Sequence, residues 1–284
     1  MSLNLFTEKQ KQPSNSLPKR KCASWKPWRN RKNRKENRSL KIDLKENERI
    51  DDLDIKDYKI IQHKEKFCFG MDAVLLSNFV KATKKDRVID LGTGTGVIPI
   101  LLEAKEKGGE FVAVEVQEES ADMARRSIAL NDLSDKIELV CMDLKEASDY
   151  FGKAVFDVVT TNPPYMTMKG GLKNPNEAKA IARHEILCTL SDVIKASTNL
   201  LKPGGRLFMV HRPNRLPEIF EELKANNMGA KRIQFVYPYA GAKANMLLIE
   251  AVRGAKPEFN VMEALIIYNE KGEYTSQVLE IYGK

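Results

Sequence analysis

A glycine-rich segment, Asp90-Leu-Gly-Thr-Gly-Thr-Gly96, constrains the fold more than any other part of this sequence. It stands between a short apolar run at 87–91 and a helical apolar pattern at 97–107. Glycines at such a turn allow backbone conformations that other residues avoid, and they let a ligand approach the main chain. The segment alone is weak evidence for one ligand, because nicotinamide- and flavin-binding enzymes share it. It predicts a strand, a ligand-binding turn and a helix, in that order.

Strand and helix patterns alternate through most of the remaining chain. After a hairpin at 49–62 and a helix that ends near Lys81, strands are predicted at 87–91, 111–116, 137–141, 156–161, 207–211, 232–236 and 246–252. Helices are predicted at 97–107, 119–130, 185–201 and 216–226. This alternation is typical of a mainly parallel sheet with helices on both faces. We therefore expect a Rossmann-like α/β fold with seven strands and a C-terminal antiparallel strand.

Carboxylates stand at the ends of the first three strands of this predicted sheet. Asp90 ends the first, Glu115 ends the second and Asp143 directly follows the third. A carboxylate in the position of Glu115 can accept hydrogen bonds from both hydroxyls of a ribose, and Asp143 could accept from an adenine amino group. The GxGxG spacing differs from the GxGxxG of pyrophosphate-binding turns. The combination favours S-adenosylmethionine as cofactor, with S-adenosylhomocysteine as its product and no metal.

The fourth predicted strand ends in Asn162-Pro163-Pro164-Tyr165. The prolines cannot continue a strand and hold the backbone extended. The side-chain oxygen of Asn162 and the carbonyl of Pro163 can each accept a hydrogen from one NH2 group, while Tyr165 offers a flat face for stacking. The tetrapeptide predicts a catalytic site, formed by Asn162, Pro163 and Tyr165, that methylates a planar amide or an exocyclic amine.

Charge and composition divide the chain into regions. Residues 1–45 carry 14 Lys/Arg against 3 acids and have no hydrophobic period, so a disordered basic tail is expected. Residues 46–284 are expected to form a single domain, with a hairpin and helix cap (46–81), a core (82–256) and a C-terminal extension (257–284). No run of 18 apolar residues suggests a membrane span. Four cysteines without a CxxC pair favour reduced thiols and a cytoplasmic protein.

These motifs resemble the bacterial adenine-N6 methyltransferases that act on valine tRNA beside the anticodon, over roughly residues 46–284. The narrower features of the resemblance are Phe67-Cys-Phe-Gly-Met-Asp-Ala-Val-Leu-Leu76, Ala182-Arg-His-Glu185, Leu201-Lys-Pro-Gly-Gly205, Val210-His-Arg-Pro213 and Ile281-Tyr-Gly283. The resemblance implies N6-methylation of an adenine in tRNA. It also implies that Phe69, Gly70 and Asp72 border the cofactor. The expected cofactor-binding residues are then Phe69, Gly70, Asp72, Asp90, Gly92, Gly94, Gly96, Glu115, Asp143 and Asn162.

Basic residues that follow the fourth strand are expected to hold the phosphates of tRNA. They are Lys169, Lys173, Arg183, Arg212, Lys243 and Arg253. Three alternatives stay open. A glutamine-N5 methyltransferase acting on release factors uses the same tetrapeptide, although such enzymes usually carry an N-terminal helical bundle. The other two are a methyltransferase of rRNA bases and a non-enzymatic RNA-binding module.

Overall fold

Nine strands form the central sheet of the protein in the computed structural model, which describes residues 43–64, 69–163, 188–256 and 258–284. Five strands run parallel: β3 (Arg87–Leu91), β4 (Glu110–Glu115), β5 (Ile137–Cys141), β6 (Phe156–Thr161) and β7 (Leu201–His211). β9 (Met246–Arg253) is antiparallel to β7 and to β8 (Met228–Tyr239). The strand order is β10-β8-β9-β7-β6-β3-β4-β5, in which β10 is the short strand Asn260–Val261. The Rossmann-like fold and the antiparallel strand are confirmed.

The expected number of seven strands is too low. β10 (Asn260–Val261) and β11 (Leu265–Tyr268) come from the C-terminal extension, and both pair in parallel with β8. Each is too short to show an alternating pattern in the sequence. Both form because β8 offers a free edge of hydrogen-bonding groups.

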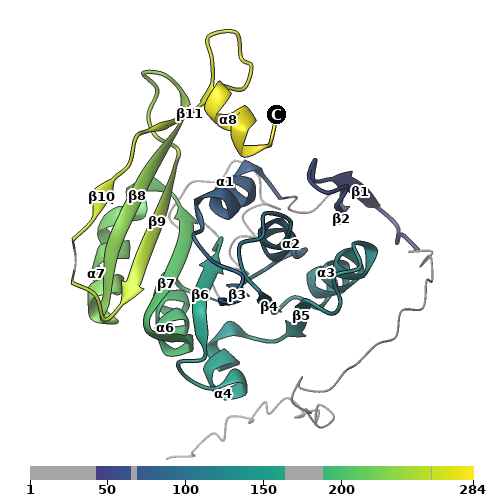
Figure 1. The fold of residues 1–284 in the computed structure, drawn as a ribbon, viewed down its shortest axis with the longest axis horizontal. Coiled ribbons are helices and arrows are strands. Elements are labelled where there is room, and N and C mark those ends of the chain that lie inside the picture. Colours follow the sequence, from purple (N-terminus) through teal and green to yellow (C-terminus); the bar gives the residue numbers. More distant parts are fainter. Residues whose placement is uncertain (1–42, 65–68, 164–187, 257) are drawn as a thin grey trace, which may run out of the picture. The chain divides into compact units, whose positions relative to one another are not determined.

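Helices cover both faces of the sheet because neighbouring residues of each buried strand point to opposite sides. Val88 packs in one core cluster with α1 (Met71–Phe79), α2 (Val97–Ala104), α3 (Glu118–Leu130) and α8 (Ser276–Ile281). Ile89, the next residue, packs in the other cluster with α4 (Ala147–Phe151), α6 (Leu190–Leu200) and α7 (Leu216–Ala225). Figure 1 shows α1, α2 and α3 side by side, with α4, α6 and α7 across the sheet. Two short 3-10 turns, η1 (Leu144–Glu146) and η2 (Pro213–Arg215), directly precede α4 and α7.

Two expected boundaries differ around β7. The helix expected from residue 185 begins at Leu190, because Thr189 and Asp192 form a reciprocal capping box there. Residues 185–187 lie outside the described part of the chain. The residues Lys202–Gly205, expected to follow a helix as a stop signal, belong instead to β7. Gly204 takes a φ of 78°, and the pairing of β6 with β7 shifts register between Phe156 and Val158. The proline and glycines therefore mark an irregularity inside a long strand.

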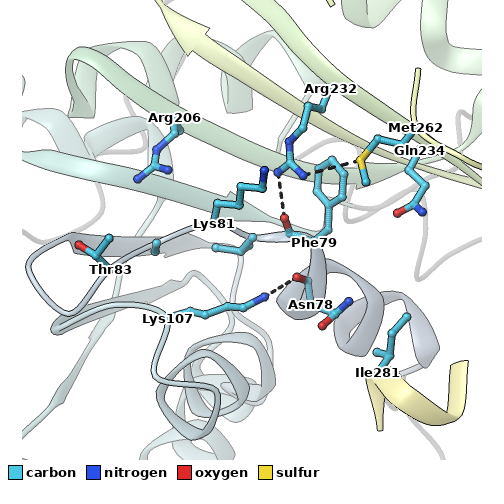
Figure 2. Close-up of a pocket in the computed structure, with 12 residues that line it drawn as sticks. Asn78, Phe79, Lys81, Thr83, Lys107, Arg206, Arg232, Gln234, Met262 and Ile281 are labelled. Atoms are coloured by element: carbon cyan, nitrogen blue, oxygen red, sulfur yellow. Dashed lines mark hydrogen bonds between the residues drawn. The ribbon is translucent and has the colours of Figure 1, made fainter. Parts of the chain in front are cut away.

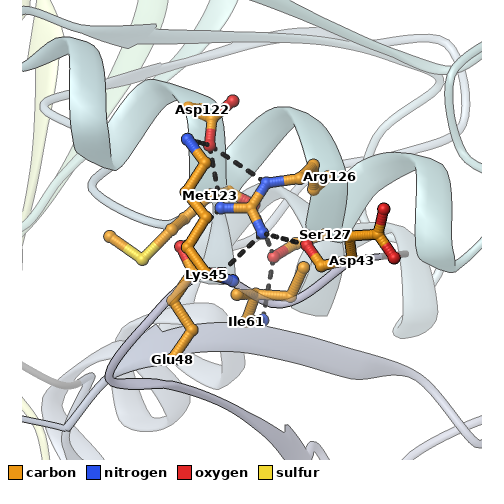
Figure 3. A network of polar contacts seen from close by, with 8 residues as sticks. All are labelled: Asp43, Lys45, Glu48, Ile61, Asp122, Met123, Arg126 and Ser127. Carbon is orange, nitrogen blue, oxygen red and sulfur yellow. Dashed lines mark hydrogen bonds and ion pairs between the residues drawn. The ribbon is translucent and has the colours of Figure 1, made fainter.

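The hairpin of β1 (Glu48–Asp52) and β2 (Lys59–His63) is antiparallel, as predicted, and is fastened to α3. The guanidinium of Arg126 donates to both carboxylate oxygens of Glu48, at 2.6 and 2.7 Å, and also pairs with Asp122. Lys45 reaches the same Asp122 at 2.7 Å, which Figure 3 shows. Glu48 is 9% exposed, so the protein shields this ion pair from solvent on one side, and salt weakens it less than it would weaken an exposed pair. The network holds the start of the described chain against α3.

Candidate active site

The carboxyl ends of the parallel strands gather the predicted site residues along one edge of the sheet. β3 lies between β4 and β6, so the chain crosses from one side of β3 to the other between β5 and β6. In open α/β sheets, ligands bind outside the carboxyl ends of the strands at such a reversal. Asp90, Glu115 and Asn162 all stand at or directly after these strand ends.

The glycine turn after β3 adopts the left-handed backbone that its composition predicts. Gly92, Gly94 and Gly96 have φ values of 74°, 58° and 86°. The amides of Gly92 and Thr93 both donate to the carbonyl of Val114 at 2.9 Å. A side chain at Gly96 would also come within 3.3 Å of Ala124 on α3. The first two glycines are needed for their backbone angles, and Gly96 is needed in addition for close packing against α3.

Asp90 and Thr93 leave two buried polar atoms beside this turn without partners. Asp90 is 1% exposed, and one carboxylate oxygen accepts from the Thr160 hydroxyl at 2.7 Å. Among the described residues, neither Asp90 Oδ2 nor Thr93 Oγ1 has a hydrogen-bond partner. Burial raises the pKa of Asp90 from its ordinary value of 3.8 to about 6. Unsatisfied buried groups are costly, so these two atoms suit a ligand that brings donors or positive charge.

Glu115 connects the end of β4 to the glycine turn. Its carboxylate is buried and accepts from the amide of Gly94 and from the amide of Gln117, each at 2.9 Å. Each carboxylate oxygen has a second acceptor position, which keeps the predicted contact to a ribose chemically possible. Asp143, the third predicted acid, caps η1 by accepting from the amide of Lys145 at 3.0 Å. It also forms an ion pair with the Lys145 side chain at 3.2 Å.

Asn162 and Asp72 form a contact that was not predicted. The amide nitrogen of Asn162, just past β6, donates to Asp72 Oδ2 at 2.9 Å. Asp72 lies in the first turn of α1, is 7% exposed, and accepts the amide of Ala73 with its other oxygen at 2.9 Å. Asp72 was expected to border the cofactor. The structure joins it to the predicted catalytic asparagine, which comes 90 residues later in the chain, and its place beside the cofactor stays a prediction.

The segment before α1 is held by the N-terminal hairpin. Gln62 in β2 is 1% exposed, and its side-chain oxygen accepts the amide of Phe69 at 2.7 Å. Gly70 is the N-cap of α1. A side chain there would approach Asp72 Oδ1 to 3.0 Å, which is tighter than ordinary contacts. Phe69 itself packs against the core cluster that contains α1. The hairpin therefore positions the residues that present Asp72.

Comparison with known proteins identifies the family. The model of the methyltransferase small domain matches residues 63–232. The chain belongs to the methyltransferase small domain family. The tRNA1(Val) (adenine(37)-N6)-methyltransferase of Bacteroides fragilis is 28% identical over 203 residues, 72% of this chain and 79% of the relative. Its namesake from Aeromonas hydrophila is 26% identical and covers 75% of this chain and 87% of its own.

Solved structures agree with this assignment. A predicted O-methyltransferase from Agrobacterium tumefaciens, protein Atu636, superposes with a TM-score of 0.61 and 26% identity. The match covers 75% of this chain and 96% of that one. A tRNA m1G37 methyltransferase from M. jannaschii has a TM-score of 0.51 at 14% identity, over 74% of this chain and 58% of that one, and supports the fold alone.

The end of β7 adds a buried histidine to the active-site edge of this methyltransferase. His211 is 1% exposed, and its Nδ1 accepts the amide of Arg212 at 2.8 Å. Burial, followed by the nearby Arg215, lowers the pKa of His211 from 6.5 to about 4. The side chain is therefore neutral at physiological pH. Its hydrogen bond to the backbone gives it a role in shaping the strand end.

The predicted RNA-binding residues of the methyltransferase divide into three groups. Arg212 follows β7 and donates to the carbonyl of Asn245 at 2.7 Å, so the turn that carries Lys243 lies at the active-site edge. Arg253 does not share that edge. It ends the antiparallel β9 and donates to the carbonyl of Leu201, where β7 begins. The antiparallel direction predicted for this strand implies that position, whereas chain order alone does not. Lys169, Lys173 and Arg183 lie outside the described residues, as does Tyr165 of the catalytic tetrapeptide.

A hollow of about 540 Å³ lies between the end of α1 and the outer strands. Its wall includes Arg206, Arg232 and Lys107, which Figure 2 shows with Phe79 and Asn78. Arg232 pairs with Glu250 and donates to the carbonyl of Phe79 at 3.1 Å, and Lys107 donates to carbonyls at the end of α1. Arg232 thus ties the end of α1 to the sheet, Lys107 ties it to the loop after α2, and Arg206 pairs with Asp86. Because these cations already have partners, we assign no ligand to this hollow.

Neither a metal centre nor a membrane span appears in the described part of the methyltransferase. No group of three or more His, Cys, Asp or Glu side chains there is arranged to hold a metal ion. No helix formed by the described residues is both long and apolar enough to cross a bilayer.

Proposed function

We propose that this methyltransferase transfers a methyl group from S-adenosylmethionine to N6 of an adenine in tRNA, beside the anticodon of a valine tRNA. The names of the curated relatives support this substrate. The observation that carries the proposal is the hydrogen bond from Asn162 to Asp72, because it turns the amide nitrogen of Asn162 toward the carboxylate and the amide oxygen away from it. An adenine amino group presents the donors that such an acceptor requires.

The cofactor fits the unsatisfied atoms at the glycine turn. Asp90 Oδ2 and Thr93 Oγ1 would receive the ammonium group of the methionine part. Glu115 would accept from the ribose, Asp143 would face the adenine, and Gly92, Gly94 and Gly96 would allow the ligand to approach the backbone. Phe69 and Gly70 would border it from the N-terminal side. When bound, S-adenosylmethionine supplies an electrophilic methyl group, and its transfer to the amine leaves S-adenosylhomocysteine and a proton.

The chain's own contribution to the reaction is orientation and electrostatics. An exocyclic amine is a weak nucleophile because its lone pair is delocalised into the ring. The Asn162 side-chain oxygen and the Pro163 carbonyl would accept its two hydrogens and favour the pyramidal nitrogen. Tyr165 would stack on the base, which must leave any helical stack to reach the site.

Basic residues at the same edge support an RNA substrate. Arg212 and Lys243 lie at the active-site edge, and we include Lys169, Lys173 and Arg183 in the proposed RNA surface. Residues 46–284 would act as one domain, and a tRNA substrate would be met in the cytoplasm.

The deciding experiment offers the full-length protein total tRNA, ribosomal RNA and release factor with labelled S-adenosylmethionine. Mass spectrometry of nucleosides then identifies the product. N6-methyladenine in tRNA supports the proposal. Label in release factor or ribosomal RNA would contradict it and favour the glutamine amide or the ribosomal base as the substrate.

A charge reversal tests the RNA surface. Lys243→Glu should weaken tRNA binding and reduce its dependence on salt, since each lost phosphate contact lowers that slope by about one. Lys224→Glu is the matched control, because Lys224 is exposed in the last turn of α7. Equal tRNA affinity for Lys243→Glu and the control would remove Lys243 from the surface.

A further inference from the structure

The carboxylate of Asp72 faces the predicted catalytic asparagine from a different element of the fold. Asp72 Oδ2 lies 2.9 Å from Asn162 Nδ2, and Asp72 Oδ1 accepts the amide of Ala73 at 2.9 Å. Asp72 is 7% exposed, so water competes little for these contacts. The first turn of a helix also favours negative charge. Asp72 is therefore a fixed acceptor beside Asn162.

A fixed acceptor determines which end of the Asn162 amide points toward it. An asparagine amide has two orientations that exchange its oxygen and its nitrogen. Only one of them places the NH2 group against Asp72. The other would set the amide oxygen against a carboxylate oxygen at hydrogen-bond distance, where two acceptors repel. With the nitrogen toward Asp72, the Asn162 oxygen points away from the carboxylate.

We infer that Asp72 is a positioning residue that selects amino groups as substrates by holding the Asn162 amide in this orientation. The inference rests on the proposed function and extends it to the choice of substrate. A base with an amino group donates to the Asn162 oxygen. A base with a carbonyl in the same place is rejected, because it cannot donate to the Asn162 oxygen and two facing acceptors repel each other. The hydrogen bond that Asn162 donates to the Asp72 carboxylate also polarises the Asn162 amide and makes its oxygen a stronger acceptor.

The first test is Asp72→Asn, which keeps the shape and removes the charge. Asn162 can then take either orientation, because an asparagine at position 72 both donates and accepts. We expect kcat for an adenosine-containing anticodon stem-loop to fall about 10- to 100-fold, the effect of losing a hydrogen bond to a charged group. The affinity for S-adenosylhomocysteine should stay within about twofold. Asp149→Asn, at an exposed acid in the first turn of α4, is the matched control and should keep normal kcat.

A second measurement separates orientation from general damage. A stem-loop with inosine at the target position carries a carbonyl in place of the amino group. It should inhibit the wild-type protein poorly. The affinity for the inosine stem-loop, divided by that for the adenosine stem-loop, should be several-fold higher in Asp72→Asn than in the wild type. The reason is that the flipped Asn162 amide can donate to the carbonyl. An unfolded or distorted variant would bind both RNAs less well and would not change their ratio.

A double substitution tests whether Asp72 acts through Asn162. In single-turnover assays, Asn162→Ala with Asp72→Asn should be no slower than Asn162→Ala alone. A further loss of the size seen in Asp72→Asn, an unchanged inosine ratio, or a loss confined to S-adenosylhomocysteine affinity would each overturn the inference. If the wild-type protein methylates a protein amide and not adenosine, the proposed substrate is wrong. The kcat comparison and the double substitution then test Asp72 on that amide.

Discussion

Replacing Asp90 by asparagine should make the ligand-free protein more stable at neutral pH while weakening cofactor binding. Burial raises the pKa of Asp90 from 3.8 to about 6. The folded protein therefore favours the protonated carboxyl. The stabilisation of the folded state by this protonated carboxyl is complete below about pH 4 and is lost as the pH rises through about 6. The difference between the folded-state pKa of about 6 and the ordinary pKa of 3.8 corresponds to about 3 kcal/mol in the free energy of unfolding. About 2 kcal/mol of this stabilisation is lost as the pH rises from 4.5 to 8.

Urea denaturation of the wild-type protein and of Asp90→Asn across this pH range measures the effect. The difference between the two free energies of unfolding cancels the titration of all other groups. It should move by about 2 kcal/mol in favour of the variant as the pH rises from 4.5 to 8. Calorimetry with S-adenosylhomocysteine should show the opposite order of affinity, because a bound ammonium stabilises the ionised carboxylate. A difference that is flat with pH, or a variant that binds the ligand normally, would refute this reading of Asp90.

Three further outcomes follow from the site. Asn162→Ala should lower kcat about 100-fold or more, with S-adenosylhomocysteine affinity preserved in calorimetry; near-normal turnover would exclude Asn162 from the reaction. Glu115→Ala should weaken the ligand by about 2–4 kcal/mol, because it removes the ribose acceptor and the partner of the Gly94 amide; unchanged affinity would mean that Glu115 does not face the ribose. Deleting residues 1–42 should leave a folded, active protein by circular dichroism and methyl transfer, since Lys45 keeps its contact with Asp122; loss of the folded signal would refute this.

The sheet could be predicted from the sequence where local pattern decides the structure. The apolar runs at 87–91, 137–141 and 156–161 match β3, β5 and β6 residue for residue. β3 and β6 are largely buried, and such parallel strands leave nearly continuous apolar segments. The glycine turn was predictable because a left-handed backbone favours glycine, and glycines can be read directly from the sequence.

Features that depend on distant partners could not be predicted in this way. The bond between Asp72 and Asn162 joins residues 90 apart, and nothing near either residue indicates the other. Arg253 is a different case, because the antiparallel direction predicted for the last strand already separates it from Lys243, and chain order alone grouped the two. The start of α6 was readable as well, because Thr189 and Asp192 form a capping signal, which the longer apolar pattern obscured.

The glycine turn after β3 is shaped by bonds that the chain supplies to itself. Val114 accepts the amides of Gly92 and Thr93, and Glu115 accepts that of Gly94. A ligand arriving here therefore spends little conformational entropy on ordering the loop. Its association should be fast and nearly insensitive to changes in the turn. Substitutions at these glycines would then act mainly on the residence time of the ligand.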